Sequence, residues 1–76
     1  METCSISLNS IEKVKGFVSA IQTCEGEFDL SSDRYKVDAK SIMGIFSLDL
    51  SKTLRLDIYD EAVADKIMPA LKDYIV

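Results

Sequence analysis

The sequence predicts one α+β domain, residues 1–76, in which a four-stranded antiparallel sheet carries helices packed on one face. Three observations support this fold class. The 76 residues are 47% hydrophobic, which is enough for one small core. Apolar residues alternate with polar ones along four short segments, as in half-buried strands. In three other segments they recur at helical spacing, and the resulting order is βαββαβα, in which each element has one apolar side to bury.

The seven elements follow one another without an internal repeat or linker. The predicted strands are residues 3–9, 28–30, 35–39 and 54–58. The predicted helices are residues 11–23, 42–47 and 60–75. In the last helix the inward side chains are expected to be Val63, Ile67, Ala70, Leu71 and Tyr74. Pro69 removes a backbone hydrogen bond and clashes with the preceding turn, so a kink is expected near residues 65–68.

Short polar residues mark the beginnings of the first two helices. Asn9 and Ser10 both offer cap chemistry to the first helix, and Glu12 would complete a capping box if Asn9 were the cap. Ser41 can cap the short apolar helix. Gly26 is expected to end the first helix.

Composition argues against several classes of function. The formal charge is −4, without a clustered basic face, which argues against a nucleic-acid binder. No apolar run is long enough to span a bilayer and the acidic N-terminus does not resemble a signal peptide, so a cytoplasmic protein is expected. Cys4 and Cys24 lie far apart, without histidine co-ligands, and are expected to be buried or half-buried thiols and not metal ligands.

Enzyme chemistry has little support. The chain has no histidine, and its three glycines are isolated, so there is no glycine-rich phosphate loop. Nucleophile activation usually needs a histidine or an activated lysine, and the serines stand at caps and turns. We therefore expect no enzyme activity and no cofactor.

One segment points to a particular protein family more clearly than the features described above. Residues 37–48 read VDAKSIMGIFSL. This segment resembles the regulatory-serine region of the histidine-containing phosphocarrier protein (HPr) family of the bacterial sugar phosphotransferase system. The βαββαβα order agrees with that family's open-faced sandwich, and the resemblance extends over essentially the whole chain.

The resemblance implies that the family's phosphohistidine relay is absent. In the family, the active histidine begins the first helix and is followed by alanine, arginine and proline. Counting back from Ser41 without gaps places Ser10 at the histidine position and Glu12 at the arginine position, with Lys13 replacing the proline. A serine ester transfers its phosphoryl group less readily, Ser10 has no neighbouring base, and Glu12 would repel a phosphoryl group. The alternative is that Ser10 and Glu12 are ordinary helix-capping residues.

Ser41 and its helix carry the remaining expectations. The resemblance implies regulatory phosphorylation of Ser41 by a dedicated kinase, and a plain N-cap is the alternative; the two are compatible. Ile42, Met43 and Phe46 are very apolar for a short surface helix. In the family this helix docks partner enzymes and regulators. The alternative is inward packing, and one of Ile45 and Phe46 must pack inward.

These residues predict an HPr-like regulatory, protein-binding module with a degenerate active site, controlled by phosphorylation at Ser41. The family resemblance implies protein partners: phosphotransferase-system enzymes, the bifunctional kinase or a transcriptional regulator. One family subgroup lacks the histidine, keeps the serine and acts in carbon-catabolite regulation. Two alternatives stay open. One is a phosphocarrier that transfers phosphoryl groups, and the other is a structural or oligomerising domain that has lost both sites.

Overall fold

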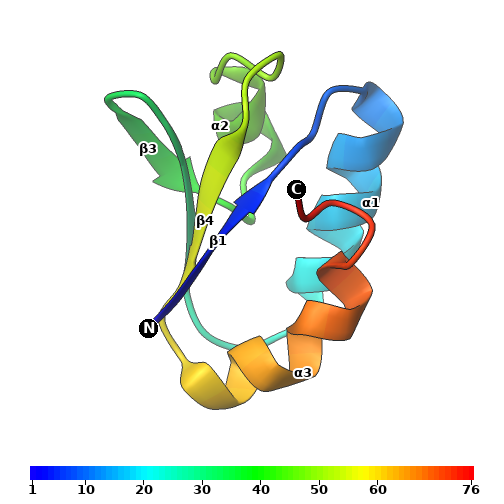
Figure 1. Cartoon of the computed structure of the whole chain (residues 1–76), viewed down its shortest axis with the longest axis vertical. Helices are drawn as coiled ribbons and strands as arrows, with labels where there is room; N and C mark the ends of the chain where they lie inside the picture. The colour runs from blue at the N-terminus through cyan, green and yellow to red at the C-terminus, as the bar shows by residue number, and fades with distance from the viewer.

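A four-stranded antiparallel sheet forms one layer of the molecule, and three helices form the other (Figure 1). The computed structural model describes residues 1–76. The strands are β1 (Glu2–Ile6), β2 (Phe28–Ser32), β3 (Tyr35–Asp38) and β4 (Leu54–Ile58). The helices are α1 (Ile11–Gln22), α2 (Ile42–Phe46) and α3 (Glu61–Leu71). The predicted order and the α+β class are confirmed.

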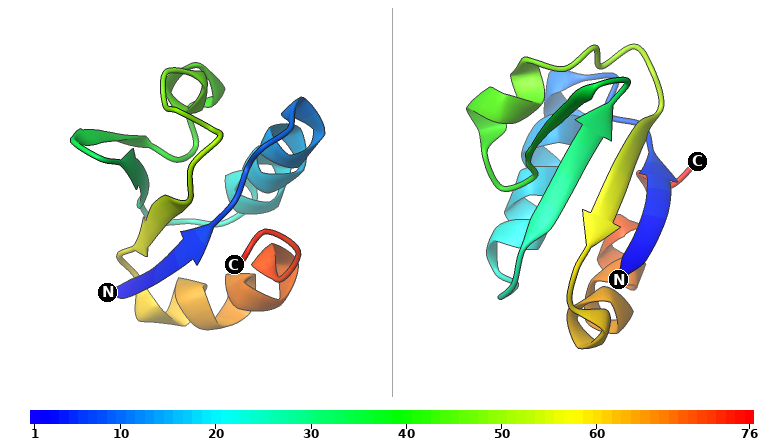
Figure 2. Two further views of the ribbon diagram at one scale, coloured as in Figure 1. Left: turned by 45° about the horizontal axis from the view of Figure 1, so that its top comes forward. Right: turned by 90° about the vertical axis from the view of Figure 1, so that its left-hand side faces the viewer.

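The strands lie in the order β1-β4-β2-β3, so the last strand in the chain is an inner strand of the sheet. β4 pairs with β1 on one side and β2 on the other, and Leu56 lies opposite both Cys4 and Leu30. Alternate residues of each strand face the helices, and most of them are apolar. The right-hand view of Figure 2 shows β1 and β4 side by side.

The core lies between the sheet and the helices. From the strands it receives Ile6, Phe28, Leu30, Leu54, Leu56 and Ile58. From the helices it receives Val14, Phe17, Ile21, Ile45, Ala64, Ile67 and Leu71. Phe17 packs edge-on against Tyr74, with ring centroids 6.0 Å apart, and this contact joins α1 to the C-terminal residues. No helix is long and apolar enough to cross a membrane.

The structure decides between the two caps that the sequence left open for α1, and it places Gly26 beyond the end of the helix. Ser10, not Asn9, is the N-cap, because the Ser10 hydroxyl accepts a hydrogen bond from the Lys13 N–H at 3.2 Å. The capping box with Glu12 therefore does not form. The helix ends at Gln22, and Gly26 lies beyond it with a φ of 97°, where it turns the chain toward β2.

The last helix is shorter than predicted. α3 continues through Pro69 but ends at Leu71, and Ala70 is exposed, not buried as expected. The residues that follow leave the helix to pair with β1. The Ser7 N–H donates to the Tyr74 carbonyl at 2.8 Å, and the Val76 N–H donates to the Ser5 carbonyl at 3.0 Å. We call residues 74–76, which make these hydrogen bonds, the C-terminal strap.

Candidate functional site

Ser41 begins α2 as an N-cap. Its hydroxyl accepts the Gly44 N–H at 3.2 Å, and its carbonyl accepts the Ile45 N–H at 3.0 Å. Its own N–H donates to the Asp38 carbonyl at 3.0 Å, which ties the cap to the end of β3. Ser41 is exposed, so the hydroxyl that caps the helix also lies at the molecular surface.

The helix that Ser41 caps exposes most of its apolar side chains. Met43 is 77% exposed, Phe46 43% and Ile42 36%, whereas Ile45 is completely buried. Of Ile45 and Phe46, one thus packs inward, as the sequence required. We call Ile42, Met43 and Phe46 the α2 patch. The chain covers this patch only in part, and α2 contains no charged residue that would make its surface polar.

Contacts on both sides hold α2 in place. Gly44 packs against Val37 of β3, and a Cβ at Gly44 would come within 3.2 Å of the Val37 Cβ. Lys40 directly precedes the N-cap Ser41. Its ammonium donates to the Cys24 carbonyl at 2.5 Å, and its carbonyl accepts from the Gln22 side-chain amide at 2.7 Å. The connection into α2 is therefore fixed to the end of α1.

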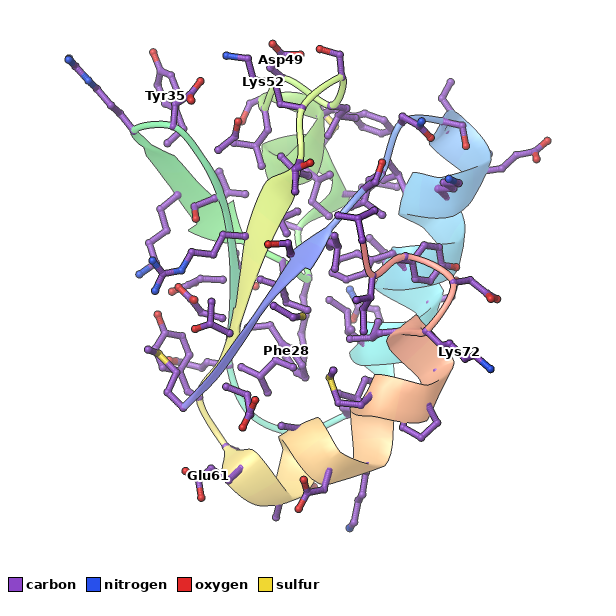
Figure 3. The ribbon with its side chains drawn as sticks, in the orientation of Figure 1. Phe28, Tyr35, Asp49, Lys52, Glu61 and Lys72 are labelled. Atoms are coloured by element: carbon purple, nitrogen blue, oxygen red, sulfur yellow. The ribbon has the colours of Figure 1, made fainter.

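Charged side chains hold the loop that follows α2, at the end of the molecule where α2 lies. Lys52 forms an ion pair with Asp33 at 3.0 Å, which joins this loop to the turn between β2 and β3. A hydrogen bond from the Ser51 hydroxyl lowers the pKa of Asp49, and the hydrogen bond to Asp33 raises the pKa of Lys52. Figure 3 shows Asp49 and Lys52 at this end of the molecule, together with Tyr35 at its corner.

Ser10 and Glu12 lie at the start of α1, and both are exposed. The Ser10 hydroxyl is occupied as a cap, and Glu12 places a carboxylate in the first turn, where the helix dipole favours negative charge. Figures 1 and 2 show the start of α1 and the α2 helix at the same end of the molecule. The residues singled out in the sequence therefore lie on two helices that share one end of the fold.

A polar cluster on the sheet face without helices was not foreseen from the sequence. Asp57 of β4 has a side chain only 5% exposed, and it accepts hydrogen bonds from Thr3 at 3.0 Å and Arg55 at 2.9 Å. The Lys36 ammonium lies 3.8 Å from Asp57 and 3.6 Å from Asp29. All four strands contribute to this cluster, and Thr3 and Asp57 are 54 positions apart, so no local signal could have found it.

The electrostatics of this cluster favour its charged form. Burial raises the pKa of Asp57, but the hydrogen bonds from Arg55 and Thr3 and the positive charges of Arg55 and Lys36 outweigh it and lower the pKa. The hydrogen bond with Tyr59 raises the pKa of Lys36. No buried side-chain oxygen or nitrogen lacks a hydrogen-bond partner, and we interpret the cluster as structural.

The cysteines have the half-buried character expected of them. Cys4 and Cys24 are free thiols, each partly exposed. Burial, together with the charges of Glu2 and Asp57, raises the pKa of Cys4, so its thiol is less reactive than an ordinary one. No group of three or more histidine, cysteine, aspartate or glutamate residues has an arrangement that could hold a metal ion.

Comparison with known proteins bears on the fold. The chain is similar to the crystal structure of HPr-C-His from Thermoanaerobacter tengcongensis, with a TM-score of 0.79 and 26% sequence identity. The alignment covers 96% of this chain and 89% of that one. The chain has an HPr-like fold. No protein-family model matches the sequence, and no curated protein matches it either.

Proposed function

We propose that this chain is an HPr-like regulatory module that binds other proteins through the α2 patch, lacks phosphohistidine relay activity, and is controlled by phosphorylation of Ser41. The observation that carries the proposal is the exposure of Ile42, Met43 and Phe46 on a helix capped by Ser41. Large apolar side chains grouped at the surface favour a contact with another protein. Methionine adapts to differently shaped partners, which suits Met43 to such a contact.

The loss of relay activity rests on the residue types at the start of α1. The chain contains no histidine, so it cannot form a phosphohistidine. By the family resemblance, Ser10 takes the histidine's place, and its hydroxyl is occupied by the Lys13 N–H. Glu12 replaces the arginine that would hold a phosphoryl group, so restoring a histidine at position 10 alone would not restore a relay.

Phosphorylation of Ser41 would act on the α2 patch by charge. A phosphate adds about −1.5 to −2 charges at pH 7 and three acceptor oxygens. Those oxygens can accept the Gly44 N–H that the hydroxyl accepts now, so the helix would keep its cap. The patch would change from purely apolar to apolar with a strong negative charge at its edge, which changes the partners it can bind. By family resemblance the partners are cytoplasmic phosphotransferase-system enzymes, the bifunctional kinase or a regulator of carbon-catabolite genes.

A second candidate function follows from the same fold similarity. A phosphocarrier would accept a phosphoryl group from phosphoenolpyruvate through Enzyme I, and Ser10 would have to be the acceptor. The HPr-like fold favours this candidate, and the residues at the start of α1 count against it. A labile phosphorylated form in that assay would replace our proposal with the second candidate.

The kinase assay tests the regulatory role. The chain is incubated with the bifunctional HPr kinase and ATP, and the number of added phosphates is measured by mass spectrometry. We expect one phosphate on the wild type and none on Ser41→Ala. Ser47→Ala is the matched control, because Ser47 is the other exposed serine that flanks α2, and it should be modified like the wild type. Equal modification of Ser41→Ala, or none of the wild type, would contradict the switch.

Partner binding is tested at Met43. Met43→Glu places a charge in the α2 patch, and it should abolish binding to the kinase or regulator while the fold is unchanged. Ala70→Glu adds the same charge at an exposed position of α3 and should bind as the wild type does. Equal binding by both variants would show that the patch is not the docking surface.

A further inference from the structure

The two edges of the sheet are treated differently. The outer edge of β1 is partly covered by the C-terminal strap, which takes up the Ser7 N–H and the Ser5 carbonyl. On the outer side of β3 no further strand follows, and the Asp38 carbonyl at its end accepts the Ser41 N–H at 3.0 Å. An uncovered edge strand presents backbone donors and acceptors that can pair with another strand.

The backbone groups that β3 presents can be assigned from its register. Val37 lies opposite Leu30 and Asp38 opposite Asp29, and the Ala39 N–H donates to the Phe28 carbonyl at 2.9 Å. Hydrogen-bonded and non-hydrogen-bonded pairs alternate along an antiparallel ladder. Val37 therefore directs its backbone groups toward β2, whereas Lys36 and Asp38 direct theirs outward.

Lys36 and Asp38 carry opposite charges, so the outward residues of one copy of β3 can pair with those of a second copy. If two copies of β3 pair antiparallel about Val37, Lys36 of each copy lies opposite Asp38 of the other. An edge lysine ordinarily protects a strand from pairing, but in this register it meets a carboxylate twice. Lys36 is 53% exposed, and its carboxylate contacts are 3.6 and 3.8 Å long. Its ammonium carries three N–H donors, so beside the hydrogen bond with Tyr59 it has donors left for a second copy.

We propose that this chain forms a symmetric dimer in which the β3 strands of two copies pair antiparallel about Val37, with Lys36 opposite Asp38 at both ends of the contact. The outward N–H and C=O groups of Lys36 and Asp38 then supply up to four interchain hydrogen bonds. The Asp38 carbonyl also accepts from Ser41, and it has a second lone pair for the new bond. The dimer is isologous and closed, so pairing stops at two copies.

The dimer makes one eight-stranded sheet with all helices on the same face. Cross-strand neighbours point to the same face of a sheet, so the two-fold axis runs perpendicular to the sheet at Val37. Since α2 packs against Val37 through Gly44, the two α2 helices come to lie on one face of the dimer. This inference does not depend on phosphorylation of Ser41 or on the identity of any partner.

The first test measures the mass of the full chain against its concentration. Sedimentation equilibrium from about 10 μM to about 1 mM covers the range in which a small interface associates. We expect the mass to rise from 8.5 kDa toward twice that value. Asp38→Lys, which sets lysine against lysine at both ends, should weaken dimerisation at least tenfold. Asp65→Lys, an exposed position on α3, makes the same charge change and should dimerise like the wild type.

The second test fixes the register. In a background in which Cys4 and Cys24 are replaced by serine, Val37→Cys places two thiols opposite each other at a non-hydrogen-bonded pair, where a disulfide fits. Mild oxidation should link this variant into dimers, and an Asp65→Cys variant should stay monomeric. A wild type that stays at 8.5 kDa up to the highest concentration overturns the proposal. So does a dimer that Asp38→Lys leaves intact or that Val37→Cys does not link, since that result indicates another surface, such as the α2 patch.

Discussion

Helices α1 and α2 begin in the same way and then diverge. Each has a serine N-cap, Ser10 or Ser41, whose hydroxyl accepts a backbone N–H at 3.2 Å. Over its twelve residues α1 presents a buried face made of Val14, Phe17 and Ile21. Over its five residues α2 buries Ile45 alone and leaves its other large side chains at the surface.

Packing within the chain accounts for only part of the apolar surface of α2. A helix of one and a half turns is not stable alone, so α2 depends on the contacts that hold it in place. Ile45 and Gly44 supply contacts within the helix, and Lys40 and Ser41 supply hydrogen bonds before it. Ile42, Met43 and Phe46 bury only part of their surface, which supports the proposal that the α2 patch serves binding.

The largest expected effect comes from the two phenylalanines. Phe17 is completely buried against Tyr74, so Phe17→Ala should lower the free energy of unfolding by about 3–5 kcal/mol. Phe46 is 43% exposed, so Phe46→Ala should cost less than about 1 kcal/mol. Urea denaturation followed by circular dichroism measures both. Comparable losses would show that α2 is a core element like α1 and would remove the main support for a docking role.

The second-largest expected effect is a difference in stability cost between alanine substitutions at the two glycines that lie in helices. A Cβ at Gly16 would overlap the Tyr74 hydroxyl, so Gly16→Ala should cost about 1–3 kcal/mol by displacing the C-terminal strap. Tyr74→Phe removes the obstructing hydroxyl and should recover most of that loss in the double variant. At Gly44 a Cβ would lie 3.2 Å from the Val37 Cβ, 3.4 Å from the Ser41 Oγ and 3.5 Å from the Ser41 Cβ. Alanine's higher helix propensity, worth about 1 kcal/mol, offsets the tight contact with Val37.

Denaturation of the two single variants and the double variant gives the coupling between positions 16 and 74. A double variant no more stable than Gly16→Ala would mean that the ring, not the hydroxyl, sets the close approach. A larger loss at Gly44 than at Gly16 would reverse the comparison and make α2 the more tightly packed helix.

Local patterns in the sequence were enough to predict the elements and their order. The alternation of apolar and polar residues predicts the four strands, and helical spacing predicts the three helices. The sequence also predicts that Ser41 can cap α2, and its hydroxyl accepts the Gly44 N–H. The choice between Asn9 and Ser10 was different. Both residues are good caps, and the decision depends on where the chain leaves the buried Leu8, which local preference does not contain.

Long-range pairing accounts for what the sequence could not predict. The C-terminal strap ends α3 early because its backbone groups find partners at Ser5 and Ser7. Ala70 lies within α3 and is exposed, because the buried face of the helix consists of Ala64, Ile67 and Leu71. The Asp57 cluster needs the register that places Thr3 opposite Asp57, two residues 54 positions apart. The sequence predicts that α2 is apolar, but it does not predict which of its side chains are exposed. The burial of Ile45 decides this, because it leaves Ile42, Met43 and Phe46 at the surface.

The smallest expected effects lie in the caps themselves, and they separate capping from signalling. Ser10→Ala and Ser41→Ala should each cost about 0.5–2 kcal/mol, with the larger loss at Ser10 because α1 anchors three core side chains. Ser41→Asp should keep the fold within about 0.5 kcal/mol of the wild type, because aspartate caps as well as serine and suits the helix dipole. Thermal denaturation measures the stabilities, and the kinase or regulator is titrated against the same variants. If Ser41→Ala binds normally while Ser41→Asp does not, negative charge beside the α2 patch controls binding. If both variants bind normally and only Ser41→Ala loses stability, Ser41 is a cap and nothing more.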